Sequence, residues 1–407
     1  MRILFLTSAL ERVAGYWRAI HLARQLVALR HEVTVVCQRN ERSFQCDHKI
    51  IDGVRLYLLP PLFTSEESIF QSAMRPALMF FMQTGLNILR GVTSDIDVLH
   101  TFDALLPQNA LPTILSKRRR PSHRPLVFVD WDDWWGRGGI LDVFSEGVYR
   151  KITSFLTFME EKVPLYADGV TVTNQILGKR AIGVGVKPED LFVIPNGADV
   201  EKIKSLDMYD ARKFLRLPPK AVIYATYPKK AVHVRYGKRF MERNSVLLAH
   251  KTVVAAYPNA FLLLLGRESE EWMAEAKSLG VDKRIISVGF QPADRYSLYL
   301  SASNFFIFSI KNTVFDRARS PLRIMDYMAA GRPIIATDLP EIKEVAHGCG
   351  LFFRPCEPGN LAEKILHAIR EPDLCKKMGE LARERAAKRY SWSALAQQLE
   401  KAYYQML

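Results

Sequence analysis

The sequence predicts an α/β protein built from two doubly wound domains, each with a mainly parallel β-sheet. The chain has 407 residues, which is too many for one hydrophobic core and fits two domains of about 200 residues each. Short apolar, β-branched runs alternate with stretches of helical periodicity. At the N-terminus, a strand at 2–6, a helix at 17–30 and a strand at 32–37 form a β-loop-α-β unit of the doubly wound kind.

The composition indicates a folded protein with an anionic partner. Hydrophobic residues make up 48% of the chain, and the formal net charge is +14. The first figure excludes a disordered chain, and the second calls for a nucleotide, nucleic acid or an acidic lipid surface. The five cysteines show no C-x2-C spacing and are predicted to be reduced thiols in the cytoplasm. No secretory signal is recognised, and no apolar run reaches the ~18 residues of a membrane span.

Apolar runs predict the remaining elements in order. Strands are expected at 54–59, 97–100, 126–129, 167–173 and 191–196 in the first domain, and at 221–226, 260–265, 285–289, 305–310, 334–337 and 350–353 in the second. An amphipathic helix is predicted at 149–159, with Ile152, Phe155, Leu156 and Met159 on its apolar side. From residue 361 onward the pattern is helical.

One apolar cluster, at 77–82, has two interpretations. It lies in a predicted helix between Arg75 and Arg90. Either it packs against the sheet, or it forms an interfacial helix on a bilayer. The basic run at 117–120 is either a solvated loop or a second contact with an anionic membrane surface.

The stretch 320–337 contains the most specific pattern in the chain. Ser320 is predicted to cap a helix whose first position is Pro321. Gly331 ends this helix, Pro333 prevents its continuation, and 334–337 reads as a buried parallel strand. The free N–H groups of such a helix start suit a phosphate.

Arg323 and Asp326 lie one turn apart on this helix. They form either a solvated ion pair, or a nucleotide site in which Arg323 binds phosphate and Asp326 binds a ribose diol.

The motif Ser-Pro-Leu-Arg-x-x-Asp-Tyr-Met-Ala-Ala-Gly-Arg-Pro-Ile-Ile-Ala-Thr resembles the donor-nucleotide segment of family-4-type retaining glycosyltransferases (glycosyl transferases group 1). The resemblance implies the GT-B fold, in which two Rossmann-like domains face each other across a cleft. In this family a Glu-x7-Glu pattern precedes Ala-x-Gly-x-Pro. Asp326 takes the place of the second Glu, which binds the ribose. The first Glu, which contacts the donor sugar, falls at Ala318, so the chain departs from the family there, and Asp316 is the nearest carboxylate.

Two further segments resemble the family and set the expected domain boundaries. Residues 193–199, Val-Ile-Pro-Asn-Gly-Ala-Asp, resemble its hinge, and 390–392, Tyr-Ser-Trp, resemble the start of its final helix. The expected domains are therefore an acceptor-side domain at 1–200 and a donor domain at 201–390. The helix 391–407 is expected to pack back on the first domain.

The resemblance also implies the donor site. A loop with Gly15 would face the donor phosphates, and Arg18 would reach them from the next helix. Lys238 and Arg243 match the family's basic pair in spacing and charge, although a solvated basic loop is the alternative. Phe290 would lie by the base. The expected donor-binding set is Gly15, Arg18, Lys238, Arg243, Phe290, Ser320, Pro321, Leu322, Arg323 and Asp326.

The stretch 130–139, Asp-Trp-Asp-Asp-Trp-Trp-Gly-Arg-Gly-Gly, follows a predicted strand. Indole rings stack on sugars and carboxylates accept hydroxyl protons, which predicts an acceptor site, whereas aspartates that cap the turn are the alternative. The predicted acceptor residues are Asp130, Trp131, Asp133 and Trp134, and the predicted catalytic residues are His100, Asp132 and Asp316. For His100, which stands at the end of a predicted strand, a structural, hydrogen-bonded histidine is the alternative.

These patterns and the resemblance together predict an enzyme that moves a sugar from a nucleotide-diphosphate sugar to a hydroxyl of a saccharide or lipid-linked acceptor. Retention at the anomeric carbon is implied by the resemblance alone. No cofactor, metal or nucleic acid is expected to take part. The expected location is the cytoplasm, with the inner face of a membrane as a further possibility. The alternatives are a nucleotide-sugar epimerase, a basic nucleic-acid-binding protein, and a noncatalytic nucleotide-sugar binder, which the alanine at 318 suggests.

Overall fold

The computed structural model describes residues 1–11, 14–41, 45–61, 83, 85–87, 95–102, 104–118, 124–144, 149–228, 243–266 and 270–407. Contacts between Cα atoms group the chain into two compact units. Unit 1 comprises Met1–Asn196, Ala318–Ser320 and Trp392–Leu407, and unit 2 comprises Gly197–Arg317 and Pro321–Ser391. The apolar cluster at 77–82, with Arg75 and Arg90, lies outside the described residues.

Unit 1 is built on one sheet, which has the order β3-β4-β2-β1-β5-β6-β7-β8 in the described residues. Neighbouring strands are parallel, except that β3 pairs antiparallel with β4. The strands are β1 (Arg2–Leu10), β2 (Glu32–Gln38), β3 (Asp47–Ile51), β4 (Val54–Leu59), β5 (Val98–Phe102), β6 (Leu126–Trp131), β7 (Gly169–Val172) and β8 (Leu191–Val193).

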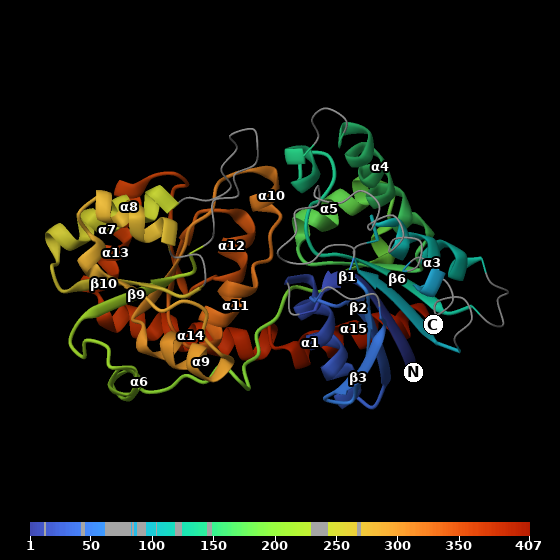
Figure 1. Ribbon diagram of the computed structural model, residues 1–407, viewed down its shortest axis with the longest axis horizontal. Coiled ribbons are helices and arrows are strands. Elements are labelled where there is room, and N and C mark those ends of the chain that lie inside the picture. Colours follow the sequence, from blue (N-terminus) through green and yellow to red (C-terminus); the bar gives the residue numbers. More distant parts are fainter. Residues whose placement is uncertain are drawn as a thin grey trace. The chain divides into compact units, whose positions relative to one another are not determined.

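Helices cover both faces of this sheet (Figure 1). On one face, α3 (Pro107–Lys117), α4 (Tyr149–Lys162) and α5 (Gln175–Gly183) share an apolar cluster with β6 and β7. On the other face, α1 (Ala14–Ala28) packs against α15 (Trp392–Met406). In that contact, the rings of His21 and Trp392 stack with centroids 5.1 Å apart. The last helix of the chain is therefore part of unit 1.

Unit 2 has an all-parallel sheet, of order β11-β10-β9-β12-β13-β14 in its described part. The strands are β9 (Val222–Thr226), β10 (Ala260–Leu264), β11 (Ile285–Ser287), β12 (Phe305–Phe308), β13 (Ile334–Thr337) and β14 (Gly350–Phe353). In both sheets the order reverses beside the first parallel strand, between β1 and β5 and between β9 and β12. The predicted α/β fold with two doubly wound sheets is confirmed.

The two faces of the second sheet carry separate apolar clusters. One cluster contains buried residues of α9 (Ala293–Ala302), α11 (Leu322–Ala329), α12 (Pro340–Val345) and α14 (Pro372–Arg389). The other contains residues of α7 (Arg243–Ala256), α8 (Glu270–Ser278) and α13 (Pro358–Arg370). Two short helices complete the described part of the unit, α6 (Met208–Leu215) and α10 (Val314–Arg317).

The structure corrects three local predictions. β3 was not predicted, because its sequence DHKII is largely polar and forms an edge. β1 runs on to Leu10, so Gly15 lies in the first turn of α1 rather than in a loop. Helix α11 starts at Leu322 with Pro321 as N-cap, and no side chain caps it.

Gly331 ends α11 as predicted, and it meets another glycine. It has a φ of 70°, which suits a residue without Cβ just after a helix. A Cβ atom added at Gly379, on α14, would lie 2.4 Å from the Gly331 carbonyl oxygen. Two helices of unit 2 thus approach each other through backbone atoms.

We expect Gly379→Ala to lower the free energy of unfolding of unit 2 by about 1–3 kcal/mol, because a backbone carbonyl must move to admit the methyl group. Gly359→Ala on α13 is the matched control, since a Cβ there meets nothing within 4 Å. The control should change stability by no more than ~0.5 kcal/mol. Urea unfolding of both variants tests this, and equal stabilities would contradict the close approach.

Candidate functional site

A cluster of polar and aromatic side chains lies at the start of α11 in unit 2. The guanidinium carbon of Arg323 lies 3.5 Å from the ring centroid of Tyr227, a residue that follows β9. Arg323 Nη1 donates to the hydroxyl of Tyr296, over 3.1 Å. This hydroxyl donates in turn to Asp326 Oδ2, over 3.2 Å. Arg323 and Asp326 therefore meet through Tyr296, and no direct ion pair joins them in the described residues.

The electrostatics of this cluster differ from those of a solvated ion pair. Burial raises the pKa of the Asp326 carboxyl from 3.8 to about 6, although the Arg323 charge and the Tyr296 hydrogen bond act in the opposite direction. Asp326 is thus a poorly solvated acceptor beside a cation. The sequence motif indicated Arg323 and Asp326, whereas it gave no signal for Tyr227 and Tyr296, which reach them from distant segments.

Ser320 does not cap the helix. Its hydroxyl oxygen accepts a hydrogen bond from the backbone N–H of Asn196, at 3.3 Å, and its carbonyl accepts from Asn196 Nδ2, at 2.7 Å. The predicted cap is therefore wrong, because Asn196 engages both oxygens of Ser320. Pro321 and Leu322 remain at the helix start, and their predicted role toward a donor is untested.

The predicted carboxylate near position 318 is enclosed. Asp316 lies on α10 with 1% of its surface exposed. The Thr313 hydroxyl donates to its Oδ2, at 2.7 Å, and its backbone N–H donates back to the same hydroxyl oxygen. Ala318 is fully buried in the apolar cluster of unit 1. Asp316 thus has a local structural contact, and its substitution for the missing Glu stays a prediction.

In unit 1, Arg18 and Asp130 bind each other. Arg18 Nε and Nη2 donate to the two oxygens of Asp130, at 2.9 and 2.8 Å. The remaining donors of Arg18 reach the carbonyls of Ile194 and Pro195 and the side chain of Asn196. Arg18 is 1% and Asp130 3% exposed. In this structure Arg18 and Asp130 are each other's buried partner, and the predicted roles of Arg18 toward donor phosphates and of Asp130 toward the acceptor stay predictions.

His100 extends this network into the core. Thr171 Oγ1 donates to Asp130 Oδ1, at 2.5 Å, so it accepts from His100 Nε2, at 3.1 Å. His100 Nδ1 then accepts from the Tyr403 hydroxyl, at 2.6 Å. Burial lowers the pKa of His100 from 6.5 to about 4, so the ring is neutral at neutral pH. These contacts favour a structural role, and a catalytic role stays a prediction.

The tryptophan-rich stretch is held by Glu160 and Arg180. The Arg180 guanidinium lies over the rings of Trp131 and Trp134, at 4.8 and 4.6 Å from their centroids, and binds both oxygens of the buried Glu160. Glu160 also accepts the backbone N–H groups of Trp135 and Gly136. Trp131 is 4% exposed, which leaves little of its ring accessible, and its contact with an acceptor sugar stays a prediction.

The other predicted acceptor residues are more accessible. Asp132, Asp133 and Trp134 are partly buried, and Asp132 lines a small cavity with Trp135 and Glu160. Trp134 lines a wider surface hollow of about 500 Å³. Their acceptor roles stay predictions. No group of three or more His, Cys, Asp or Glu side chains is arranged to hold a metal ion within the described ranges.

The structure gives little information on three residues of the predicted donor site. Phe290 follows β11 with 63% of its surface exposed. Lys238 lies outside the described residues. Arg243 begins α7, but its side chain is among those not described. The donor roles of Lys238 and Arg243 therefore stay predictions.

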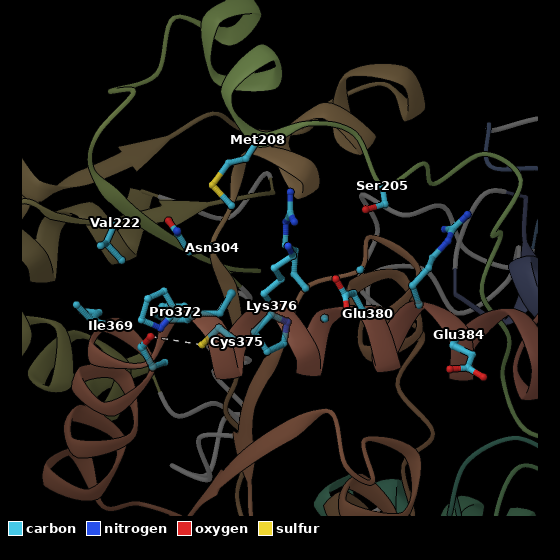
Figure 2. A pocket seen from close by; sticks show the side chains of 17 residues that line it. Ser205, Met208, Val222, Asn304, Ile369, Pro372, Cys375, Lys376, Glu380 and Glu384 are labelled. Carbon is cyan, nitrogen blue, oxygen red and sulfur yellow. Dashed lines mark hydrogen bonds between the residues drawn. The ribbon is translucent and has the colours of Figure 1, made fainter.

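A hollow among the described residues of unit 2 lies at the opposite, amino-terminal edge of the sheet. Its volume is about 780 Å³, and Val222, Phe305 and Pro333, at the starts of β9, β12 and β13, line it. Figure 2 shows Cys375, Lys376, Glu380 and Glu384 of α14 along its wall. Because α/β proteins bind ligands at the carboxyl ends of their strands, this hollow is not the candidate site.

Comparison with known proteins finds two family matches. Residues 17–202 match the family described as Glycosyltransferase Family 4, and residues 241–371 match the family described as Glycosyl transferases group 1. Each half of the chain is thus similar to a glycosyltransferase family. The two matches cover most of both units.

Solved structures of low sequence identity share the fold of this chain. Sucrose-phosphate synthase from Thermosynechococcus elongatus has a TM-score of 0.74 at 17% identity, covering 99% of this chain and 98% of that chain. Alr3699/HepE from Anabaena, in complex with UDP and glucose, has a TM-score of 0.66 at 16% identity, covering 98% of each.

A curated relative matches over a shorter length. Phosphatidyl-myo-inositol mannosyltransferase from Mycobacterium tuberculosis is 25% identical over 224 residues, which is 53% of this chain and 54% of that protein. The chain thus spans about half the length of this relative.

We expect Asp130→Asn to destabilise unit 1 by about 3–5 kcal/mol, because it leaves Arg18 buried without its anionic partner. Arg55→Gln is the control, since Arg55 and Glu32 form an ion pair between exposed side chains worth at most ~1 kcal/mol. Denaturant unfolding measures both. Comparable effects of the two variants would show that the buried pair has no special weight.

Proposed function

We propose that this chain is a hexosyltransferase that moves a sugar, with retention, from a nucleoside diphosphate sugar to a hydroxyl of a saccharide or lipid-linked saccharide. Two findings support the proposal: both halves match glycosyltransferase families, and the Arg323–Tyr296–Asp326 cluster combines a cation with a carboxylate at a helix start. The solved structure of Alr3699/HepE contains UDP and glucose, and the mannosyltransferase relative is named for a phosphatidylinositol acceptor.

In the proposed reaction, the bond between the anomeric carbon and the diphosphate oxygen breaks, and the electron pair leaves with the diphosphate. The anomeric carbon bonds to the acceptor oxygen on the face that the diphosphate leaves, and the proton of the acceptor hydroxyl passes to the oxygen of the leaving diphosphate. Arg323, the α11 start and the basic segment with Lys238 and Arg243 stabilise the leaving diphosphate. Asp326 accepts hydrogen bonds from the ribose hydroxyls. We propose that no metal or cofactor takes part, which turnover in excess chelator tests.

We propose further that the chain acts in the cytoplasm in polysaccharide biosynthesis, without a nucleic acid partner. None of the described helices is long and apolar enough to cross a bilayer. Binding to arbitrary duplex DNA with a steep salt dependence would contradict this part of the proposal.

A noncatalytic nucleotide-sugar binder is the second candidate. The alanine at 318 is fully buried, and Asp316 is held by Thr313, so the described residues place no exposed carboxylate where the family has its first Glu. Donor binding without turnover across a broad panel of acceptors would favour this candidate.

We expect nucleoside diphosphates and their sugars to raise the thermal stability of the wild type. A ligand present at a hundred times its Kd adds about 2.7 kcal/mol to the free energy of unfolding. Asp326→Ala should reduce this shift strongly, because the ribose loses its acceptor. Asp338→Ala, an exposed carboxylate of the same unit, is the control and should retain the shift. A full shift in Asp326→Ala would contradict the ribose role.

We expect the affinity for a nucleoside diphosphate sugar to fall as the pH drops below 6. Asp326 has a raised pKa of about 6, so below this pH the free protein carries a protonated carboxyl, and binding through the carboxylate must release that proton. Well below pH 6 the loss approaches about tenfold per pH unit. The esterified diphosphate of the donor does not titrate in this range. Calorimetric titration measures the effect, and Asp326→Asn should bind weakly without this pH step.

A further inference from the structure

Helix α4 exposes large apolar side chains, two of which, Ile152 and Phe155, belong to the apolar side that the sequence predicted. Ile152, Phe155 and Phe158 are 55%, 50% and 54% exposed, whereas Met159 is 9% exposed and packs in the core of unit 1. Beyond the end of α4, Leu165 and Tyr166 in the 3-10 helix Val163–Tyr166 are 41% and 43% exposed. The apolar surface thus continues from one element to the next.

The exposed residues follow one stripe of the helix. Lys151, Phe155, Phe158 and Lys162 are spaced i, i+4, i+7 and i+11, which places them on the same side of an α-helix. We call these four residues, with Leu165 and Tyr166, the α4 face. Figure 1 shows α4 on the side of the unit 1 sheet away from α1 and α15. Helix α3, which contacts the same 3-10 helix, adds the exposed Leu111 and Leu115.

The charge around this face is positive. Arg150, Lys151 and Lys162 are exposed on α4, and Lys179 is exposed on α5. Of the two acidic residues on α4, Glu160 is buried and bound to Arg180, which leaves Glu161, which is partly buried. Two aromatic rings are therefore flanked by a lysine at each end of the stripe, and Glu161 is the one carboxylate of α4 that is not fully buried. A further carboxylate, the exposed Asp142, lies on the 3-10 helix Ile140–Phe144 that contacts α4.

We propose that the α4 face docks on the surface of an anionic lipid bilayer, with the helix lying in the plane of the membrane. The two phenylalanine rings would enter the boundary between headgroups and acyl chains, and the lysines would extend to the lipid phosphates. Each cation near an anionic leaflet strengthens such binding. A second copy of the chain fits this face less well, because pairing two α4 faces would bring lysines against lysines.

This inference deepens the proposed function, since a lipid-linked acceptor is presented at such a surface. Its test needs neither donor nor acceptor, so it succeeds or fails independently of the transferase activity.

The experiment is cosedimentation of the full chain with vesicles at low salt, either of phosphatidylcholine alone or of two parts phosphatidylcholine to one part phosphatidylglycerol. The wild type should bind the anionic vesicles, and added salt should weaken the binding. The double variant Phe155→Ser, Phe158→Ser should bind at least tenfold more weakly. The double variant Lys151→Gln, Lys162→Gln should lose binding to anionic vesicles and show a shallower salt dependence.

Phe214→Ser is the matched control, because Phe214 is 66% exposed on α6 of unit 2 and lies outside the α4 face. It should bind vesicles like the wild type. Thermal unfolding of every variant checks that it is folded. Phe158→Trp provides a second readout, since its indole emission should shift to the blue on anionic vesicles. Failure of the wild type to bind, full binding by the phenylalanine double variant, or a change of oligomeric state in that variant would each overturn the proposal.

Discussion

The buried pair of Arg18 and Asp130 is the interaction on which the carboxyl edge of unit 1 depends. It joins α1 to the end of β6, and through the other donors of Arg18 it fixes the three residues after β8. Two charges in a dry interior are costly unless every donor and acceptor is satisfied. Here the fork of Arg18 is filled by one carboxylate, one amide oxygen and two carbonyls. Removal of any of these partners would leave a buried donor of Arg18 without a hydrogen bond and without water to replace it.

The same pair anchors a line of neutral hydrogen bonds that runs through the sheet. Asp130 accepts from Thr171 on β7, Thr171 accepts from His100 on β5, and His100 accepts from Tyr403 on α15. Because burial lowers the pKa of His100 to about 4, its ring is neutral. This series of hydrogen bonds therefore contains no cation at the His100 end. In unit 2 the polar cluster is of another kind, since Asp326 retains a raised pKa beside Arg323 and lies partly open to solvent. The Arg18–Asp130 pair, whose hydrogen bonds are made within the protein, therefore has a structural role. The Asp326 carboxylate, which is partly open to solvent, is suited to accept hydrogen bonds from a ligand.

Local patterns predicted most of the elements, and long-range contacts decided the rest. β13 and the end of α11 at Gly331 follow from β-branched residues and a glycine. β3 was missed, because an antiparallel edge strand such as Asp47–Ile51 has only one face to bury and carries polar residues. Ser320 has the right residue type for a cap, yet its hydroxyl bonds to Asn196, more than a hundred positions earlier.

The candidate site shows the same division. Arg323 and Asp326 stand three positions apart in a recognisable motif, so the sequence indicated them. Tyr296 lies on another helix, and only the fold brings its hydroxyl between them. Arg18 was assigned to an anion because a cation at a helix start suggests one; the anion proved to be Asp130, whose place across the sheet no local pattern records.

The membership of α15 in unit 1 has a consequence for biosynthesis. A ribosome releases the segments of unit 2 before it releases Trp392–Met406, so unit 2 can complete its sheet while unit 1 still lacks a helix. Until then His100 lacks its hydrogen-bond partner, the hydroxyl of Tyr403. The apolar side of α1 that packs against α15 is exposed to solvent. A nascent chain that stalls late in translation would therefore present an unfinished amino-terminal half, which is the kind of surface that chaperones bind.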